Sequence, residues 1–224
     1  MTKKKAIIFD VDGLMVDSEP LSHRAWNDFL RPFGHQVNDE MVQQMIGFRA
    51  DISTKFVRET FDLTLSIEEI ISQRAAIYAQ LQADVGVPPM PGLLALHEVI
   101  AQRQIPWAVA TSSPHHHAET ILAQLQLSPT RGAIAGGDEV AHGKPAPDIY
   151  LLAAERLGVA PQDCIALEDS GPGSRAAVAA GMLTIAIPNA QTNFADFSHV
   201  DYQFSSLHEV LERLDEFLID KDRV

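Results

Sequence analysis

The sequence predicts an α/β fold: a doubly wound, Rossmann-like parallel sheet that carries an inserted α-helical cap domain. Short apolar runs are each followed by a turn and then by a helical pattern, which is the order expected of a parallel sheet with helices on both faces. A long stretch of helical periodicity also separates the first two apolar runs, and a single crossover connection does not need so many residues.

The strands of this sheet are expected where the apolar runs lie. Most of the runs are too uniformly apolar to be half exposed, so we expect central strands that are covered on both sides. The candidate strands are residues 6–10, 107–111, 133–136, 165–168 and 183–187, with residues 202–204 as a short edge strand.

The inserted helices are expected between the first two strands. Ser66 and Glu69 have the spacing of a capping box, so a helix is expected to begin there. Residues 86–92 are rich in proline and glycine and cannot continue a helix, which marks the return to the main domain. We therefore assign residues 16–88 to a helical cap domain and residues 1–15 and 89–224 to the core domain.

The charge balance of the 224-residue chain limits its partners. Lys and Arg number 17 against 30 Asp and Glu, which gives a formal net charge of −13. This acidic excess repels nucleic-acid backbones, so nucleic acid is not expected as a partner. A small phosphorylated metabolite is not excluded, because a metal ion or local cations can reverse the potential at one site.

The single cysteine, Cys164, and the start of the chain bear on where the protein acts. One cysteine cannot form an intramolecular disulfide, and the first apolar run ends at Asp10, too soon for a secretion signal. No apolar run approaches the ~18 residues of a membrane span. We expect a cytoplasmic protein that does not bind a membrane, and a monomer, because the sequence has no extended apolar seam.

Two carboxylates, Asp10 and Asp12, stand at the end of the first candidate strand. Open parallel sheets bind their ligands at the carboxyl ends of strands. Residues i and i+2 of an extended segment project to the same side, so the two side chains can address one small volume. The alternative is a structural turn, because Asp and Gly are ordinary turn residues.

A second acidic pair, Glu168 and Asp169, ends the strand expected at residues 165–168. Four carboxylates that lie close together cannot all stay ionised without compensation, and Mg²⁺ is the natural partner for hard oxygen ligands. Lys144 is a candidate for further positive charge, because it lies in a proline-rich segment that fixes the backbone. Taken alone, Lys144 has the alternative of a solvated surface lysine.

Thr111 and Ser112 follow another candidate strand and precede a helical pattern. A hydroxyl and a free amide at a helix N-terminus can hydrogen-bond a phosphate. Taken alone, these residues are also ordinary helix N-caps.

Together, four motifs occur in one order along the chain: FDVDGLMVDSEP, VATSS, GKPAPDIY and ALEDS. In this combination the chain resembles the haloacid dehalogenase superfamily of aspartate-nucleophile phosphotransferases, in the branch with a helical cap after the first motif. The resemblance spans nearly the whole chain. It implies a Mg²⁺-dependent phosphatase that hydrolyses small phosphate monoesters, such as sugar or polyol phosphates.

The resemblance also implies a role for each matching residue. Asp10 is implied as the nucleophile that becomes an aspartyl phosphate, and Asp12 as the general acid and base. Thr111, Ser112 and Lys144 are implied to hold the phosphoryl oxygens. The implied Mg²⁺ ligands are Asp10, Asp12 through its backbone carbonyl, Glu168 and Asp169.

The cap is expected to choose the substrate by contacts with the leaving group. Asp17, Glu19 and Arg49 are the best candidates for these contacts, with Arg74 as a weaker fourth. The two arginines have the alternative of being solvated on a helical surface. Asp17 and Glu19 have the alternative of capping the next helix.

Two other functions stay open beside the phosphatase. β-Phosphoglucomutases of the same branch carry a cap histidine at the position that matches Ser22, whereas here the neighbouring residue is His23. One step along a helix turns a side chain by about 100°, so His23 is not expected to replace it, and a phosphatase is favoured over a mutase. A non-catalytic phospholigand-binding protein is expected to lack Asp10 or Asp12, and both are present.

The run of three histidines, His115, His116 and His117, suggests a transition-metal site at first sight. Consecutive helical positions point about 100° apart, so the three rings cannot form one chelating face. We expect a surface run at the start of a helix.

Overall fold

The computed structural model describes residues 4–218, and a parallel sheet forms the centre of the core domain. The strand order is β3-β2-β1-β4-β5-β6, and every neighbouring pair is parallel. The strands are β1 (Ala6–Phe9), β2 (Trp107–Ala110), β3 (Ile134–Ala135), β4 (Cys164–Glu168), β5 (Leu183–Ala186) and β6 (Tyr202–Gln203). Five of the six lie within the predicted ranges, β4 begins one residue earlier than predicted, and the predicted fold class is confirmed.

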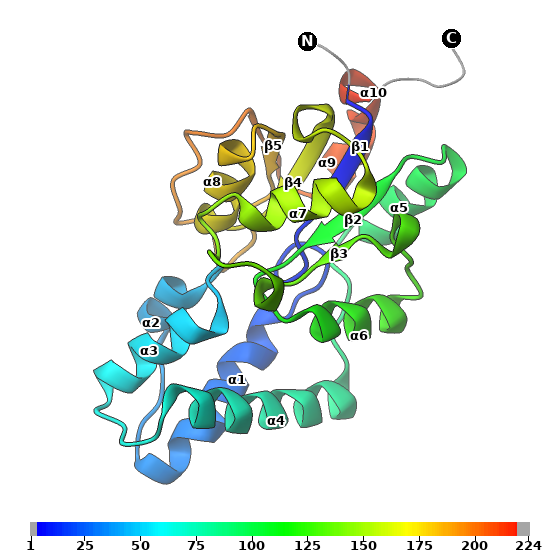
Figure 1. The fold of residues 1–224 in the computed structure, drawn as a ribbon. Coiled ribbons are helices and arrows are strands. Elements are labelled where there is room, and N and C mark those ends of the chain that lie inside the picture. The colour runs from blue at the N-terminus through cyan, green and yellow to red at the C-terminus, as the bar shows by residue number, and fades with distance from the viewer. Residues whose placement is uncertain (1–3, 219–224) are drawn as a thin grey trace.

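Helices cover both faces of the sheet (Figure 1). The core helices are α5 (Leu93–Gln102), α6 (His115–Leu125), α7 (Asp148–Leu157), α8 (Gly171–Ala179), α9 (Leu207–Glu212) and α10 (Leu214–Phe217). Successive strand residues point to opposite faces. Ile7 and Phe9 pack with residues of α5, α6 and α9, whereas Ile8 packs with residues of α7 and α8. The strands are therefore buried on both sides, as their uniform apolarity predicts.

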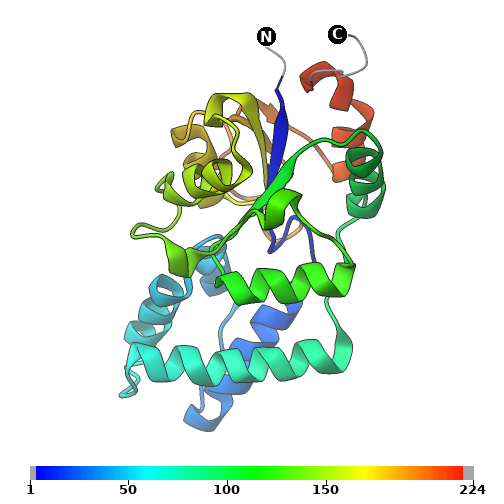
Figure 2. The ribbon, with the colours of Figure 1, turned by 45° about the vertical axis from the view of Figure 1, so that its right-hand side comes forward.

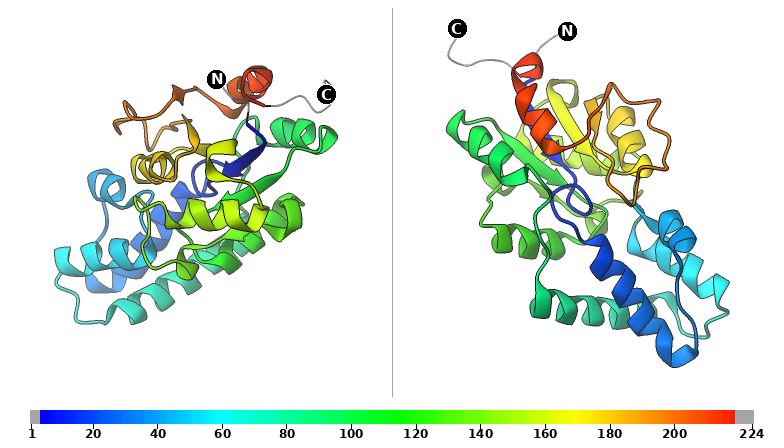
Figure 3. Two further views of the ribbon diagram at one scale, coloured as in Figure 1. Left: turned by 45° about the horizontal axis from the view of Figure 1, so that its top comes forward. Right: turned by 180° about the vertical axis from the view of Figure 1, so that it is seen from behind.

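Four further helices lie together at the carboxyl end of the strands (Figure 3). These helices are α1 (Glu19–Leu30), α2 (Asp39–Met45), α3 (Ala50–Thr60) and α4 (Ile67–Val85). They enclose an apolar core of their own, which contains Trp26, Phe29, Val57 and Ile70. Ser66 caps α4 with the predicted capping box.

Two adjacent chain segments connect these helices to the core domain. Val16 and Pro89 form an isolated antiparallel bridge, and the Asp17 N–H donates to the Pro88 carbonyl at 2.9 Å. Both crossings therefore lie side by side. No helix within residues 4–218 is long and apolar enough to cross a lipid bilayer.

Candidate active site

Polar side chains from three neighbouring strands meet at the carboxyl edge of the sheet. Asp10 follows β1, Thr111 follows β2, and Glu168 is the last residue of β4. These side chains come together because β1 lies between β2 and β4. A cavity of about 580 Å³ lies between this edge and the helices of the insert, with Asp10, Asp12 and Thr111 in its wall.

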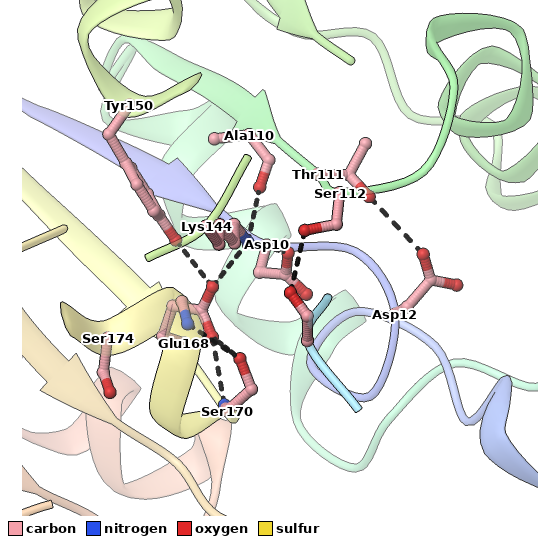
Figure 4. A network of polar contacts seen from close by, with 12 residues as sticks. Asp10, Asp12, Ala110, Thr111, Ser112, Lys144, Tyr150, Glu168, Ser170 and Ser174 are labelled. Atoms are coloured by element: carbon pink, nitrogen blue, oxygen red, sulfur yellow. Dashed lines mark hydrogen bonds and ion pairs between the residues drawn. The ribbon is translucent and has the colours of Figure 1, made fainter. Parts of the chain in front are cut away.

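Lys144 is a buried cation at the centre of the site (Figure 4). Its Nζ donates to Asp10 Oδ1 at 2.5 Å, to Glu168 Oε1 at 2.6 Å and to the Ala110 carbonyl at 3.2 Å. The Tyr150 hydroxyl donates to the same Glu168 oxygen at 2.9 Å. Burial alone would lower the pKa of Lys144, but the two carboxylates raise it above its usual value, so the lysine stays charged.

The acidic cluster of Asp10, Glu168 and Asp169 fits a divalent cation. One carboxylate oxygen from each residue lies within 4.8 Å of the others. Burial raises the pKa of both Asp10 and Asp169, and the repulsion between the carboxylates adds to this effect although Lys144 opposes it. When all three carboxyls are ionised, the cluster carries more negative charge than Lys144 compensates. Carboxylate oxygens are the ligands that Mg²⁺ prefers, so the donor set suits this ion.

Asn189 and Gly13 fix the position of Asp169. Asn189 Nδ2 donates to Asp169 Oδ2 at 2.9 Å and to the Gly13 carbonyl at 3.0 Å. Gly13 has a φ of +85°, and a Cβ at this position would stand 2.3 Å from Asp169 Oδ2. Both the backbone conformation and the space therefore require glycine directly after Asp12.

Asp12 lies on the cavity side of the same loop and has different partners. Its Oδ2 accepts hydrogen bonds from the hydroxyls of Ser113 at 2.7 Å and Thr111 at 3.4 Å, and its Oδ1 is 3.3 Å from His117 Nε2. Burial alone would raise the pKa of Asp12. The charge of His117, with hydrogen bonds from His117, Ser113 and Ser18, outweighs burial and holds the pKa below its usual value. Asp12 is therefore ionised in this arrangement.

Glu19 and Arg74, the other two predicted substrate contacts, line the cavity from the helices of the insert. Arg74 Nη2 donates to the Ser22 hydroxyl at 2.7 Å, and its guanidinium carbon lies 4.6 Å from the ring centroid of Trp26. Burial raises the pKa of Glu19 to about 7, and the charge of Asp12 adds to the shift. A carboxyl and a guanidinium thus face the same space as Asp12.

Ser112 lies in the cavity wall and also joins the core domain to the insert. Its hydroxyl donates to the Gly47 carbonyl at 2.9 Å, in the loop between α2 and α3. A Cβ at Gly47 would stand 2.6 Å from the Ser170 hydroxyl oxygen, and the φ of Gly47 is +80°. Glycine therefore permits the close approach of this loop to the core.

Asp17 and Arg49, which are predicted to contact the substrate, are not among the residues that line the cavity, although Phe48 and Ala50 beside Arg49 are. Asp17 is exposed in the connection between core and insert, where its backbone pairs with Pro88. The Arg49 guanidinium donates to both carboxylate oxygens of Asp51 at 2.8 and 2.9 Å and to the Val140 carbonyl at 3.1 Å. The physical reason is local, because Asp51 holds the guanidinium against the core loop.

The three histidines have three different surroundings, and one of them corrects the expectation of a surface run. His115 Nδ1 lies 2.8 Å from Glu139 Oε2, and His116 is exposed. The side chain of His117 is only 15% exposed and faces Asp12. The angular step between consecutive helical residues, which excludes a chelating face, also turns one of the three rings into the cavity.

Tyr78 and Gln82 of α4 also line the cavity, and the sequence reasoning missed both. They lie four residues apart, and the same spacing separates Tyr78 from Arg74. Residues with this spacing share one face of a helix. That spacing was the available signal, but it predicts a common face without showing what the face contacts.

The fold and the site together define a class of protein: an α/β protein with a doubly wound parallel sheet and a buried acid and lysine cluster beneath an inserted helical domain. The chain belongs to the haloacid dehalogenase-like hydrolase family, and the model of this family matches residues 4–181. The predicted family is therefore confirmed.

Proteins similar to this chain include several phosphatases. The probable pseudouridine-5'-phosphatase of Drosophila melanogaster is 34% identical over 89% of this chain and 88% of its own length. Hexitol phosphatase A of Escherichia coli is 32% identical over 92% and 93% of the two chains. The structure of CbbY from Rhodobacter sphaeroides in complex with phosphate is 30% identical, covers 92% of this chain and 96% of its own, and has a TM-score of 0.82. The family and these relatives identify the chain as a phosphatase.

Proposed function

We propose that this phosphatase hydrolyses small phosphate monoesters, above all sugar or polyol phosphates, through an aspartyl phosphate on Asp10 and with Mg²⁺. The observation that carries the proposal is that two carboxylates on one loop have different surroundings. Asp10 is bound to Lys144 at the edge of the sheet, whereas Asp12 faces the cavity between core and insert. The hexitol phosphatase among the relatives supports the substrate class.

The first chemical step is a displacement at phosphorus. A carboxylate oxygen of Asp10 forms a bond to phosphorus while the bond to the ester oxygen breaks. Asp12 donates a proton to the departing alkoxide. An incoming phosphate ester brings negative charge close to Asp12, which raises the pKa of this carboxyl and favours the protonated form that the step needs.

The second step returns the enzyme to its starting state. Asp12, now ionised, accepts a proton from a water molecule, whose oxygen forms a bond to the phosphorus of the aspartyl phosphate. The bond between phosphorus and the Asp10 oxygen breaks, so Asp10 becomes a free carboxylate again and inorganic phosphate leaves. Lys144, Thr111 and Ser112 hold the phosphoryl oxygens during both steps, so their contribution is positioning and electrostatic stabilisation. The hydrogen bond that the Thr111 hydroxyl donates to Asp12 Oδ2 at 3.4 Å supports this role, because the hydroxyl lies beside the proposed acid.

Mg²⁺ would be held by Asp10, Glu168, Asp169 and the backbone carbonyl of Asp12. When bound, it screens the charge between the nucleophile and the phosphate and stabilises negative charge in the transition state.

We propose that residues 16–88 form the cap that closes over the substrate. We also propose that the protein acts in the cytoplasm, because the chain has one cysteine and that cysteine is buried.

The mutase alternative finds no support in the surroundings of Ser22 and His23. Ser22 accepts a hydrogen bond from Arg74 at 2.7 Å, and His23 Nε2 lies 3.3 Å from the Val37 carbonyl within the insert. Both side chains line the cavity, but neither is among the hydrogen-bond partners of Asp12 in the described residues, which are Thr111, Ser113, His117 and Ser18. Transfer of the phosphoryl group to water is therefore favoured over transfer to a second sugar hydroxyl.

Phosphate release by the purified protein tests the proposal. We expect inorganic phosphate from one class of hexose, pentose or hexitol phosphates in the presence of Mg²⁺, and none after addition of EDTA. Conversion of β-glucose 1-phosphate to glucose 6-phosphate without phosphate release, followed by NMR, would overturn the phosphatase in favour of the mutase. Phosphate release that is insensitive to EDTA would contradict the metal requirement.

A further inference from the structure

The cavity continues beyond the phosphoryl end into the space between two helices that run side by side, α4 of the insert and α6 of the core (Figure 2). We call this part the α4–α6 groove. Its wall is formed by Tyr78 and Gln82 of α4 and by His116, His117, Thr120 and Gln124 of α6. The groove is adjacent to Asp12, the proposed general acid and base. The ring of Tyr78 contacts the ring of His117 with centroids 5.5 Å apart, and His117 Nε2 lies 3.3 Å from Asp12 Oδ1.

Buried polar atoms on one face of α4 have no hydrogen-bond partner within residues 4–218. They are Arg74 Nε, the Tyr78 hydroxyl and Gln82 Nε2. Positions i, i+4 and i+8 lie on one helical ridge, which rises by about 6 Å from each residue to the next. Buried polar atoms without a partner are rare in proteins. Three of them in a row along a cavity wall therefore point to a bound molecule with polar groups at similar intervals.

The charges of the groove select among such molecules. None of its six side chains is Lys or Arg. His117 is paired with Asp12, and the side-chain amide of Gln124 donates to the Val87 carbonyl at 2.9 Å. Beyond Arg74, which lies at the end of the groove near Glu19 and Asp12, the groove therefore offers a ligand hydrogen-bonding groups but no lysine or arginine for a second phosphate. A chain of uncharged hydroxyl groups fits this chemistry.

We propose that the α4–α6 groove binds the uncharged, hydroxyl-bearing leaving group of a monophosphate ester, and that Tyr78 and Gln82 hydrogen-bond its successive hydroxyls. This inference rests on the proposed function and adds the part of the site that determines substrate preference. Tyr78 contacts the hydroxyls next to the phosphate, and Gln82 contacts those one helical turn farther away. Longer hydroxylated chains then gain bonds that short ones cannot make.

The experiment compares kcat/KM for a hexitol phosphate with kcat/KM for p-nitrophenyl phosphate, whose leaving group carries no hydroxyl chain. The wild type is compared with Tyr78→Phe, which removes only the hydroxyl, and with Gln82→Ala. Gln73→Ala is the matched control, because Gln73 lies on the same helix but is exposed. We expect the ratio of the two kcat/KM values to fall about 3- to 10-fold in each groove variant, the worth of one neutral hydrogen bond, and to stay unchanged in the control.

Several outcomes would overturn the inference. If the wild type is active and the ratio is the same in Tyr78→Phe and Gln82→Ala as in the wild type, the groove does not bind the leaving group. The same holds if the wild type prefers a sugar bisphosphate to the monophosphate of the same sugar, because the groove would then hold a second phosphate. Absence of phosphate release from every ester would instead overturn the proposed function, and this inference with it.

Discussion

At the scale of single residues, the carboxylate of Asp10 is buried beside other carboxylates, although its proposed role is to attack phosphorus. Its carboxylate shares Lys144 with Glu168, and burial raises its pKa. The same side chain also lines the cavity. The proposed nucleophile is thus a carboxylate whose charge the lysine compensates only in part, which is the condition that favours a bound cation.

Substitution of Asp10 by Asn should abolish turnover and leave the fold intact. The amide has nearly the same shape and keeps an oxygen for Lys144, but it is not a nucleophile. Because the change also removes one carboxylate from a crowded cluster, we expect the unfolding temperature in EDTA to stay equal or to rise. Phosphate release and thermal unfolding would be compared with Asp84→Asn, an exposed control on α4. Turnover by Asp10→Asn close to the wild-type rate would contradict the mechanism.

Substitution of Lys144 tests how much its positive charge contributes to the stability of the fold. Lys144→Ala leaves Asp10 and Glu168 buried without their cation, and breaking such a buried pair costs about 3–5 kcal/mol in free energy of unfolding. We expect excess Mg²⁺ to restore part of this loss, because it binds the same carboxylates. Urea unfolding with and without Mg²⁺ measures both effects, with the exposed Lys55→Ala as control. Full stability of Lys144→Ala in EDTA would contradict this prediction.

At the scale of secondary-structure elements, the loop after β3 holds two core helices in place through one carboxylate. Glu139 accepts hydrogen bonds from Arg156 of α7 at 2.8 and 2.9 Å and from the Gly136 N–H at 2.8 Å. It also lies 2.8 Å from His115 at the start of α6. Since α6 carries His117 toward Asp12, this carboxylate helps to fix one wall of the site from a distance.

The hydrogen bonds from Arg156, with smaller contributions from Gly136 and His115, lower the pKa of Glu139 to about 2. A carboxyl whose pKa is lower in the folded protein than in the unfolded chain stabilises the fold at every pH above the unfolded pKa, near 4.3. This contribution to stability disappears as the pH falls toward the folded pKa, near 2. Glu139→Gln should therefore cost about 1 kcal/mol of unfolding free energy at neutral pH, a small value because the ion pair is partly solvated.

Urea unfolding at a series of pH values checks this prediction. The difference between wild type and Glu139→Gln should shrink steadily below about pH 4.3. Glu98→Gln, an exposed carboxyl on α5, serves as the control and should show no such trend. A difference that is independent of pH would show that Glu139 acts by packing and not by its charge.

At the scale of the whole molecule, the insert and the core meet through a small set of polar contacts beside the cavity. Arg49 donates to the carbonyls of Val140 at 3.1 Å and Gly137 at 3.4 Å in the core, and Ser112 of the core donates to the Gly47 carbonyl. Asp51 holds the Arg49 guanidinium by two hydrogen bonds. Arg49 therefore fastens the insert over the site, whereas the family resemblance implies a contact with substrate.

The substitution Arg49→Ala distinguishes these two roles. If Arg49 fastens the insert, kcat/KM should fall about tenfold for p-nitrophenyl phosphate and a hexitol phosphate alike, since contacts of a charged donor are lost without any change in the groove. Small-angle X-ray scattering should show a larger radius of gyration. Arg24→Ala, on the exposed side of α1, is the control. A loss confined to the hexitol phosphate would contradict the fastening role and restore the contact with substrate.

The sequence by itself determined the sheet and the chemistry at its edge. The apolar runs and the polar residues that end them are local features, and parallel strands bring their carboxyl ends to one edge whatever the details of packing. For this reason the order of motifs was enough to place Asp10, Thr111 and Glu168 together. The capping box at Ser66 is local in the same sense.

Only the tertiary structure decided what faces the cavity from the insert and from α6. Whether Arg49 meets a substrate or Asp51, which of three histidines meets Asp12, and whether Tyr78 and Gln82 line a groove depend on how two separately packed apolar cores are placed against each other. Helical spacing shows which residues share a face, but not what that face contacts. The contacts that determine substrate preference are therefore long-range, and they follow from packing that no local pattern records.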